Sequence, residues 1–256
     1  MKRQHIFITN DDGVDAPGIR SLINFVRPLA DITVVAPQKG HSGQSHAVTV
    51  GVPIRLKRLV NEPGYRIFSC SGTPVDCVKL GLQQLCEEPP DLLISGINHG
   101  SNAGINLFYS GTMAAASEGT INGIPSIGFS LCNYSHNADF SACKNPVIEI
   151  IGNALENPLP KGVTYNVNIP DIKPDEIKGI KECRMGIGRW VEEFDKRTDP
   201  FGRDYFWLTG RYDPVEVVEG TDHHALENGF VSLVPLTLDM TNYAYLKNIA
   251  EHVQKG

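Results

Sequence analysis

The stretch IFITNDDG (residues 6–13) joins a short apolar run to an amide, two adjacent carboxylates and a glycine. A helical pattern follows from Pro17 to about Leu29, and a second apolar run occupies residues 31–36. A strand, a helix and a strand joined by short links predict a right-handed parallel unit of an α/β sheet. Ligands bind at the carboxyl edge of such sheets. The sequence therefore predicts that Asp11 and Asp12 lie at a ligand-binding edge.

Strands and helices continue to alternate through the first 178 residues. We expect strands over residues 65–69, 91–95, 125–131 and 162–169, helices over 74–88, 113–121 and 139–155, and a strand or hairpin over 47–60 that Pro53 interrupts. Residues 91–95 are continuously apolar, which is typical of a middle strand in a parallel sheet. The pattern favours an α/β fold with a mostly parallel sheet.

The pattern changes from Gly179 onward. Residues 179–187, 204–212 and 230–236 look like strands without long helices between them, and Tyr243 to Val253 predicts a terminal helix. We expect one domain over residues 1–256, with a catalytic core over about 1–178 and an antiparallel hairpin extension with the terminal helix over about 179–256.

Composition excludes several classes of protein. A net charge of -6 argues against a general surface for nucleic-acid polymers or anionic membranes. No apolar run approaches the roughly 20 residues of a membrane span. The six cysteines show neither CxxC pairs nor zinc-ligand spacing, so we expect reduced thiols in a cytoplasmic protein.

The acidic pair predicts a metal site. Two adjacent carboxylates repel each other, and a cation between them best explains such a pair facing a cleft; hard oxygen ligands favour Mg²⁺, Mn²⁺ or Ca²⁺ over zinc. Ser42 and Asn98 follow two other predicted parallel strands and add neutral oxygen ligands at the same edge. The alternative is a plain loop in which Asp11 caps a turn and Asp12 is solvated.

An anion site is predicted beside the metal. Ser110, Gly111 and Thr112 open a helix, where free backbone N–H groups and the helix dipole favour an anion. Ordinary N-capping is the alternative. Glycine and asparagine alternate over residues 96–104, which suggests backbone and amide groups close to a ligand, or else a glycine-rich connection without one. We expect Trp190 and Trp207 to belong to the core or an interface.

With these motifs together, the sequence resembles the SurE family of metal-dependent survival-protein nucleotidases. The resemblance rests on ITNDDGVDAPGI (8–19), VVAPQKGHSG (34–43), GTPVDCVKLG (72–81), DLLISGINHGSNAG (91–104), YSGTMAAASEG (109–119) and GTDHHALENGFVSLVPLTLDMT (220–241). It implies a Rossmann-like three-layer core and a C-terminal extension exchanged between the subunits of a homodimer or tetramer. It also implies hydrolysis of nucleoside 5′- and 3′-monophosphates and, in some members, of short polyphosphate.

The resemblance also assigns roles to residues. It implies one divalent ion per subunit, Mg²⁺ or Mn²⁺, held by Asp11, Asp12, Ser42 and Asn98. The phosphate-contacting positions match Asn102 and residues 110–112, that is Ser110, Gly111 and Thr112. His41 stands where arginine is common in relatives, which argues against a shared catalytic role for it.

The hypothesis that follows is metal-assisted hydrolysis of phosphate monoesters. The ion orients the phosphate and activates water, while Asn102 and the N–H groups of residues 110–112 stabilise charge on the equatorial oxygens. The catalytic candidates are Asp11, Asp12 and Asn102, and one aspartate could serve as the general base. The rival hypothesis is a non-enzymatic phospho-receiver-like or nucleotide-sensing module. A receiver needs a phosphorylatable aspartate at the end of a central strand, where this chain has Ser95 and Gly96.

Overall fold

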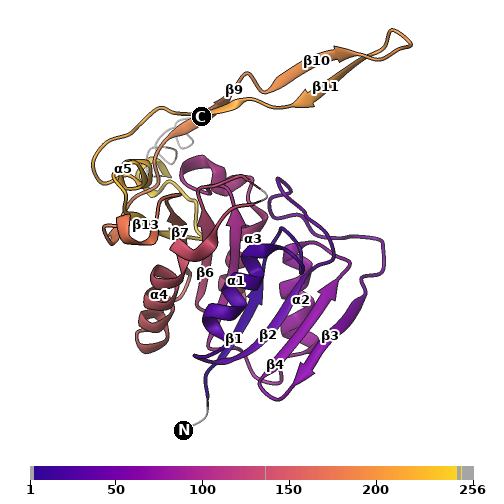
Figure 1. Cartoon of the computed structure of the whole chain (residues 1–256), viewed down its shortest axis with the longest axis vertical. Helices are drawn as coiled ribbons and strands as arrows, with labels where there is room; N and C mark the ends of the chain where they lie inside the picture. Colours follow the sequence, from indigo (N-terminus) through magenta and orange to yellow (C-terminus); the bar gives the residue numbers. More distant parts are fainter. Residues whose placement is uncertain (1–2, 136, 247–248, 250–256) are drawn as a thin grey trace.

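A nine-stranded sheet forms the centre of the computed structural model, which describes residues 3–135, 137–246 and 249 (Figure 1). The strand order is β3-β4-β2-β1-β5-β6-β7-β13-β8. Its strands are β1 (His5–Thr9), β2 (Asp31–Pro37), β3 (Leu56–Glu62), β4 (Tyr65–Cys70), β5 (Leu92–His99), β6 (Ser126–Leu131), β7 (Val163–Ile169), β8 (Ile180–Glu182) and β13 (Val231–Thr237). The strands from β4 to β7 are all parallel, whereas β3 and β13 run antiparallel to their neighbours β4 and β7. The predicted α/β fold with a mostly parallel sheet is confirmed.

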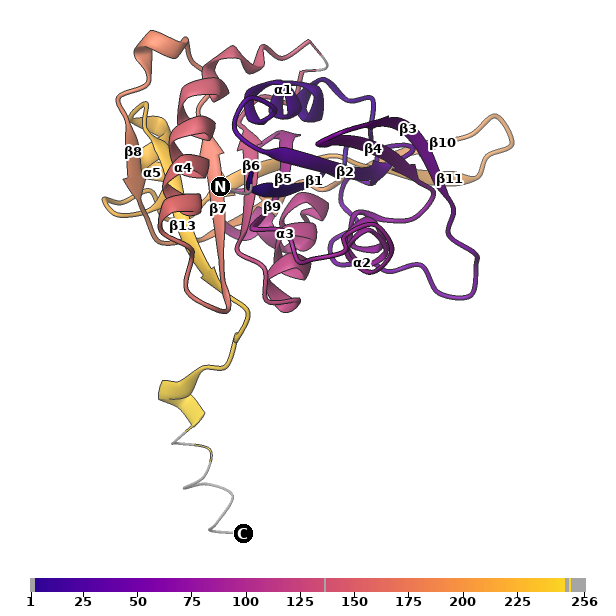
Figure 2. The same cartoon turned by 90° about the horizontal axis from the view of Figure 1, so that it is seen from below.

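Helices cover both faces of this sheet. They are α1 (Pro17–Val26), α2 (Pro74–Gln84), α3 (Gly111–Ile121), α4 (Lys144–Glu156) and α5 (Asp222–Glu227), with single turns at η1 (Gly104–Phe108), η2 (Phe140–Cys143) and η3 (Pro174–Glu176). Helices α1 and α4 contact each other on one face, and α2 and α3 contact each other on the opposite face (Figure 2). The result is the three-layer arrangement expected for the core.

The side chains of β1 join the two cores. Ile6 and Ile8 pack into the larger cluster, beside α1 and α4, whereas Phe7 packs into the smaller cluster, beside α2 and α3. Successive side chains of a strand point to opposite faces, so a strand covered on both sides must be apolar throughout. This burial anchors the strand whose end carries Asp11 and Asp12.

Two predicted boundaries differ from the structure. Residues 47–55 form no strand, because Pro53 lies within them and their polar groups bond to the start of α2: the Thr73 hydroxyl donates to the Ala47 carbonyl at 2.8 Å, and the Thr49 N–H donates to Asp76 at 3.2 Å. Conversely, β5 runs on to His99, where a loop was expected from Gly96. Its pairing with β6 shifts register between Ser95 and Asn98, which marks a bulge.

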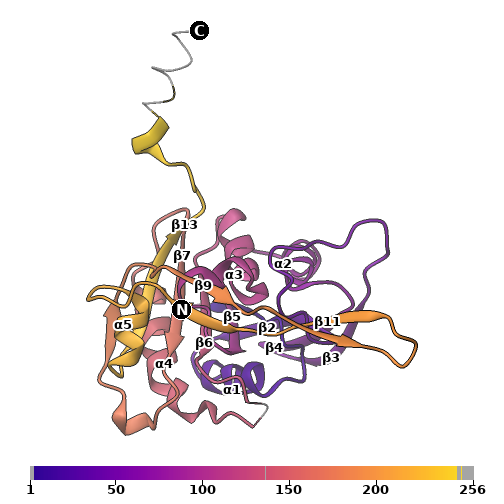
Figure 3. The ribbon, with the colours of Figure 1, turned by 90° about the horizontal axis from the view of Figure 1, so that it is seen from above.

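The C-terminal part is divided between the sheet and an arm. The strand expected near residues 230–236 is β13, which joins the main sheet beside β7, and β8 pairs with it. The arm is a long hairpin of β9 (Gly188–Val191) with β12 (Arg211–Pro214) and of β10 (Phe194–Thr198) with β11 (Asp204–Leu208). Figure 3 shows this arm crossing the carboxyl edge of the sheet. The helix predicted from Tyr243 is present over residues 243–246, and most of its remainder lies outside the described residues.

Two expectations drawn from the composition concern cysteines and membrane spans. All six cysteines are free thiols. Among the described residues, no helix is long and apolar enough to cross a membrane.

Candidate active site

A cleft of about 410 Å³ opens at the carboxyl edge of the sheet, beneath the arm. Five residues predicted from the sequence line it: Asp11, Ser42, Asn98, Asn102 and Ser110. Its other lining residues include His99, Tyr109, Tyr134, Trp190 and Leu208. The ends of separate strands and the start of α3 therefore meet in one cavity, as the parallel order of β2, β1 and β5 predicts.

Asp11 is the most buried acidic group of the cleft, with 3% of its surface exposed. Burial, together with the negative charge of Asp12, raises the pKa of Asp11 to about 6, although hydrogen bonds from Thr112 oppose the rise. The strongest of these contacts joins the Thr112 hydroxyl to Asp11 Oδ1 at 2.5 Å. A carboxylate in this setting favours either a proton or a cation.

Asp12 follows Asp11 but is not itself one of the residues that line the cleft, and 16% of its side chain is exposed. Its Oδ2 accepts the backbone N–H of His99 at 3.2 Å and lies 3.4 Å from the ring nitrogen Nδ1 of that residue. The two contacts fix one carboxylate oxygen of Asp12 against the end of β5.

The loop that carries Ser42 is attached to the core at several points. The His41 N–H donates to the Asp11 carbonyl at 2.8 Å, and the Ser45 hydroxyl donates to the Phe108 carbonyl at 2.7 Å. His46 lies 3.1 Å from the buried carboxylate of Glu118 on α3. Ser42 is thus held near Asp11 although its own side chain is exposed.

The bulge in β5 directs the side chain of Asn98. Its Nδ2 donates to the Gly100 carbonyl at 2.9 Å; because a carbonyl only accepts, the amide oxygen Oδ1 must lie on the other side. Gly96 makes the bulge possible, since its φ is +130° and a Cβ atom there would lie 2.3 Å from the Phe129 carbonyl oxygen. The bulge therefore provides a neutral oxygen ligand at the cleft.

Asn102 is held by polar side chains of the neighbouring strands. Its N–H donates to Asn168 at 2.8 Å, its side-chain amide donates to Ser130 at 2.8 Å, and its carbonyl accepts from Asn166 at 2.9 Å. An amide NH₂ carries two donors, so the bond to Ser130 leaves one for a ligand. Asn102 is well suited to donate to an anion in the cleft.

The start of α3 differs in part from the expectation. Ser110 caps the helix, because its hydroxyl accepts the Met113 N–H at 3.0 Å, and it also lines the cleft. Thr112 is fully buried and bonds to Asp11 instead of lining the cleft. Gly111 brings this helix close to Asp11, since a Cβ atom at Gly111 would lie 2.8 Å from the Cβ of Asp11.

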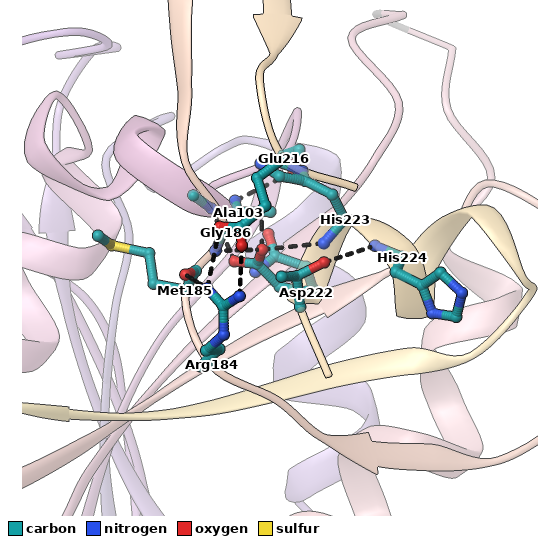
Figure 4. A network of polar contacts seen from close by, with 12 residues as sticks. Ala103, Arg184, Met185, Gly186, Glu216, Asp222, His223 and His224 are labelled. Carbon is teal, nitrogen blue, oxygen red and sulfur yellow. Dashed lines mark hydrogen bonds and ion pairs between the residues drawn. The ribbon is translucent and has the colours of Figure 1, made fainter. Parts of the chain in front are cut away.

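Asp222 holds two backbone segments together near the cleft, a role that the sequence did not reveal (Figure 4). It is completely buried; its Oδ2 accepts the Gly104 N–H at 2.7 Å and its Oδ1 accepts the Gly186 N–H at 2.8 Å. It thereby ties the loop after Asn102 to the base of the arm. The Asn-Val-Asn pattern at 166–168 was a usable signal for the polar support of Asn102, because polar side chains are unusual on a buried strand.

The donor set fits a hard divalent cation. Within residues 3–135, 137–246 and 249, no group of three or more His, Cys, Asp and Glu side chains is arranged to hold a metal ion. An ion here would instead combine the carboxylates of Asp11 and Asp12 with the neutral oxygens of Ser42 and Asn98. Oxygen donors of this kind suit Mg²⁺ or Mn²⁺, and such a set leaves coordination positions open.

Comparison with known proteins yields a consistent set of relatives. The family model described as "Survival protein SurE" matches residues 6–192. A protein of Christiangramia forsetii named 5′-nucleotidase SurE is 49% identical over 97% of this chain and 96% of its own length, and one of Bacteroides thetaiotaomicron with the same name is 43% identical over 99% and 98%. The crystal structure of the SurE protein from Aquifex aeolicus superposes with a TM-score of 0.82 at 39% identity and covers 96% of this chain and 98% of that one.

Proposed function

The chain belongs to the SurE family, and we propose that it is a metal-dependent nucleotidase that hydrolyses nucleoside 5′- and 3′-monophosphates to nucleoside and phosphate. Relatives named 5′-nucleotidase match it over nearly their whole length, which supports the enzyme class. The observation that carries the proposal is the meeting of Asp11, Ser42 and Asn98 with Asn102 and Ser110 in one cleft.

The metal requirement is supported by the electrostatics of the acidic pair. Burial and the neighbouring charge of Asp12 raise the pKa of Asp11 to about 6, so its ionised form is held at a cost that a cation beside the two carboxylates would offset. Asp11, Asp12, Ser42 and Asn98 would hold one divalent ion per subunit, Mg²⁺ or Mn²⁺. When bound, the ion supplies positive charge to the phosphate and makes water more acidic.

The protein's own groups complete the site around the phosphate. The side-chain amide of Asn102 donates to a phosphate oxygen, and the N-terminus of α3 at Ser110 and Gly111 adds the positive end of its dipole. Because Asn166, Asn168 and Ser130 already fix Asn102, this donor needs little reorganisation as charge develops on the phosphate. Asp11 and Asp12 orient the nucleophilic water, and one of them accepts its proton.

The receiver-like alternative is not favoured. A receiver needs an accessible aspartate at the end of a central strand, but β5 (Leu92–His99) contains no aspartate, and Ser95 within it is completely buried. The named relatives are also nucleotidases over nearly the whole chain.

Phosphate release tests the proposed function. AMP, 3′-AMP and tripolyphosphate are incubated with the full chain, with and without EDTA, and Mg²⁺ or Mn²⁺ is then restored in excess. We expect metal-dependent release from both nucleotides, with tripolyphosphate reporting any activity on short polyphosphate. Release from AMP that EDTA leaves unchanged would contradict the metal requirement, and no release under any metal would contradict the enzymatic assignment.

Assembly and location are part of the proposal. We infer a homodimer or tetramer formed by exchange of C-terminal elements, because the arm exposes large apolar side chains that a monomer would leave in water: Phe194, Phe201, Phe206 and Trp207. Six free cysteines support a reducing compartment, which is consistent with the cytoplasm.

A further inference from the structure

Trp190 occupies a fixed position in the wall of the cleft. It lies on β9, at the base of the arm, and lines the same cavity as Asp11 and Asn98. Its indole N–H donates to Asn106 Oδ1 at 2.9 Å. Because an indole N–H can only donate, this bond also fixes which end of the Asn106 amide faces the ring. The indole is therefore oriented before any ligand enters.

A second aromatic ring supports the indole from behind. Tyr212 on β12 meets Trp190 edge to face, with ring centroids 5.9 Å apart and an interplanar angle of 68°. The Tyr212 hydroxyl is 3.0 Å from Nε2 of His223. His223 follows the buried Asp222 in the chain (Figure 4). Asp222 also holds the Gly104 N–H, so the arm base and the loop after Asn102 share one support.

The cleft is lined by two chemically different sets of groups. Asp11, Ser42, Asn98 and Asn102 supply polar surface, whereas Tyr109, Trp190 and Leu208 supply aromatic and apolar surface to the same cavity. Tyr109 and Leu208 are 53% and 71% exposed, so their apolar surface is available to a ligand. A volume of about 410 Å³ falls within the roughly 300–1,000 Å³ usual for small-molecule sites. A nucleoside monophosphate likewise combines an anionic group with an aromatic one.

We propose that Trp190, together with Tyr109 and Leu208, binds the base of the nucleotide by stacking and apolar contact. This inference rests on the proposed nucleotidase function and extends it, because it makes the arm base the element that selects nucleotides over phosphate esters without a base. Every base has a flat π-face, so stacking of this kind accepts purines and pyrimidines alike, and purines present the larger face. Trp190, which the sequence suggested was a core or interface residue, becomes a specificity residue.

The test compares AMP with ribose 5-phosphate, which has the same phosphate and sugar but no base. In Trp190→Ala we expect kcat/KM for AMP to fall on the order of tenfold, mostly through KM, as loss of one base–aromatic stack implies. The kcat/KM for ribose 5-phosphate should stay within about twofold, because this ester has no base to stack on Trp190. Trp190→Phe, which retains an aromatic ring, should recover most of the AMP activity.

Trp207 offers a matched control, because the chain contains only two tryptophans and Trp207 does not line the cleft. It lies next to Leu208 on β11, so its side chain points to the opposite face of the hairpin. Trp207→Phe should leave KM for AMP unchanged, and it makes Trp190 the sole tryptophan. In that background, AMP should quench the fluorescence of Trp190, and ribose 5-phosphate should not.

Two results would overturn the inference: an equal fall for AMP and ribose 5-phosphate in Trp190→Ala, which would indicate a structural role, or an unchanged KM for AMP. The fluorescence measurement separates this inference from the proposed function. Quenching by AMP in a protein that hydrolyses neither ester would remove the nucleotidase assignment and leave the base site standing. Hydrolysis of AMP without selective quenching would remove the base site and leave the nucleotidase assignment standing.

Discussion

At the scale of a single residue, interactions of opposite effect act on the pKa of Asp11. Burial and the charge of Asp12 raise its pKa, whereas Thr112 stabilises its ionised form. The sequence could predict the acidic pair, because IFITNDDG places it at a strand end. It could not predict the Thr112 contact, since the two residues are brought together only by the packing of α3 against the sheet at β5 and β6.

The raised pKa of Asp11 makes the stability of the metal-free protein depend on pH. The folded chain binds this proton at a pKa of about 6, against 3.8 in the unfolded chain, so the group's contribution is most favourable below pH 3.8 and is lost as pH rises through 6. At pH 8 the penalty is on the order of 2–3 kcal/mol. Asp11→Asn should therefore be more stable than the unaltered chain in EDTA at pH 8, and this advantage should shrink towards pH 4. Urea unfolding at both pH values measures it, and an advantage independent of pH would contradict the electrostatic origin.

Thr112 should act on metal binding through Asp11. Thr112→Val keeps the size and branching of the side chain but removes the hydroxyl that donates to Asp11 Oδ1. Loss of such a supporting hydrogen bond typically weakens metal affinity by about 10- to 100-fold. Titration with Mn²⁺ should show this loss in Thr112→Val and its recovery in Thr112→Ser. Equal Mn²⁺ affinity in all three proteins would show that Thr112 does not support the site.

At the scale of elements, β5 is where sequence reasoning was least complete. The apolar run 91–95 correctly indicated a central strand, but the polar and glycine-rich residues after it looked like a loop. The structure continues the strand through a bulge to His99, because Gly96 permits the backbone to approach Phe129 closely. A glycine in the sequence indicates that the backbone needs an unusual conformation there, but it does not distinguish a loop from a bulge.

The contact between α1 and this bulge gives an element-scale prediction. A Cβ atom at Gly18 would lie 1.9 Å from the Ile97 carbonyl oxygen, so Gly18→Ala must displace the backbone next to Asn98. We expect a loss of at least about 2 kcal/mol in the free energy of unfolding. Gly152→Ala on α4 is the control: apart from the adjacent residues and the backbone of its own helix, no atom lies within 4 Å of its Cβ position, so the substitution should be neutral or stabilise by up to about 1 kcal/mol. Chemical denaturation measures both, and a Gly18→Ala protein as stable as Gly152→Ala would show that the close approach does not constrain the fold.

At the scale of the whole molecule, the C-terminal part supplies β13 to the main sheet and also forms the arm. Sequence reasoning predicted its hairpin character and strands that overlap β8, β11, β12 and β13, because these depend on local alternation, but it did not predict β9 or β10. It did not find that β13 joins the main sheet, since the partner of a strand depends on residues far away in the chain. Nor could it place Trp190 in the cleft, because only the crossing of the arm over the sheet edge brings β9 to Asp11 and Asn98.

The arm should also carry the assembly of subunits. A variant in which a short glycine-containing turn replaces residues 195–207 removes most of the exposed apolar surface of the hairpin and retains Trp190 and Leu208. Light scattering should show the full chain at a multiple of the mass of one chain and the shortened chain in a smaller assembly. The same multiple for both proteins, or a monomer for the full chain, would contradict a role of the arm in assembly.

Asp12→Asn gives the most direct test of the metal-dependent nucleotidase assignment. The substitution removes one carboxylate charge with almost no change in size, and Asp12 is partly exposed, so the fold should be retained. Phosphate release from AMP is measured for the unaltered chain and for Asp12→Asn at saturating Mn²⁺. We expect turnover to fall by at least about 100-fold, because an ion held by one carboxylate is bound and oriented poorly. A folded Asp12→Asn protein with undiminished metal-dependent phosphate release would contradict the assignment.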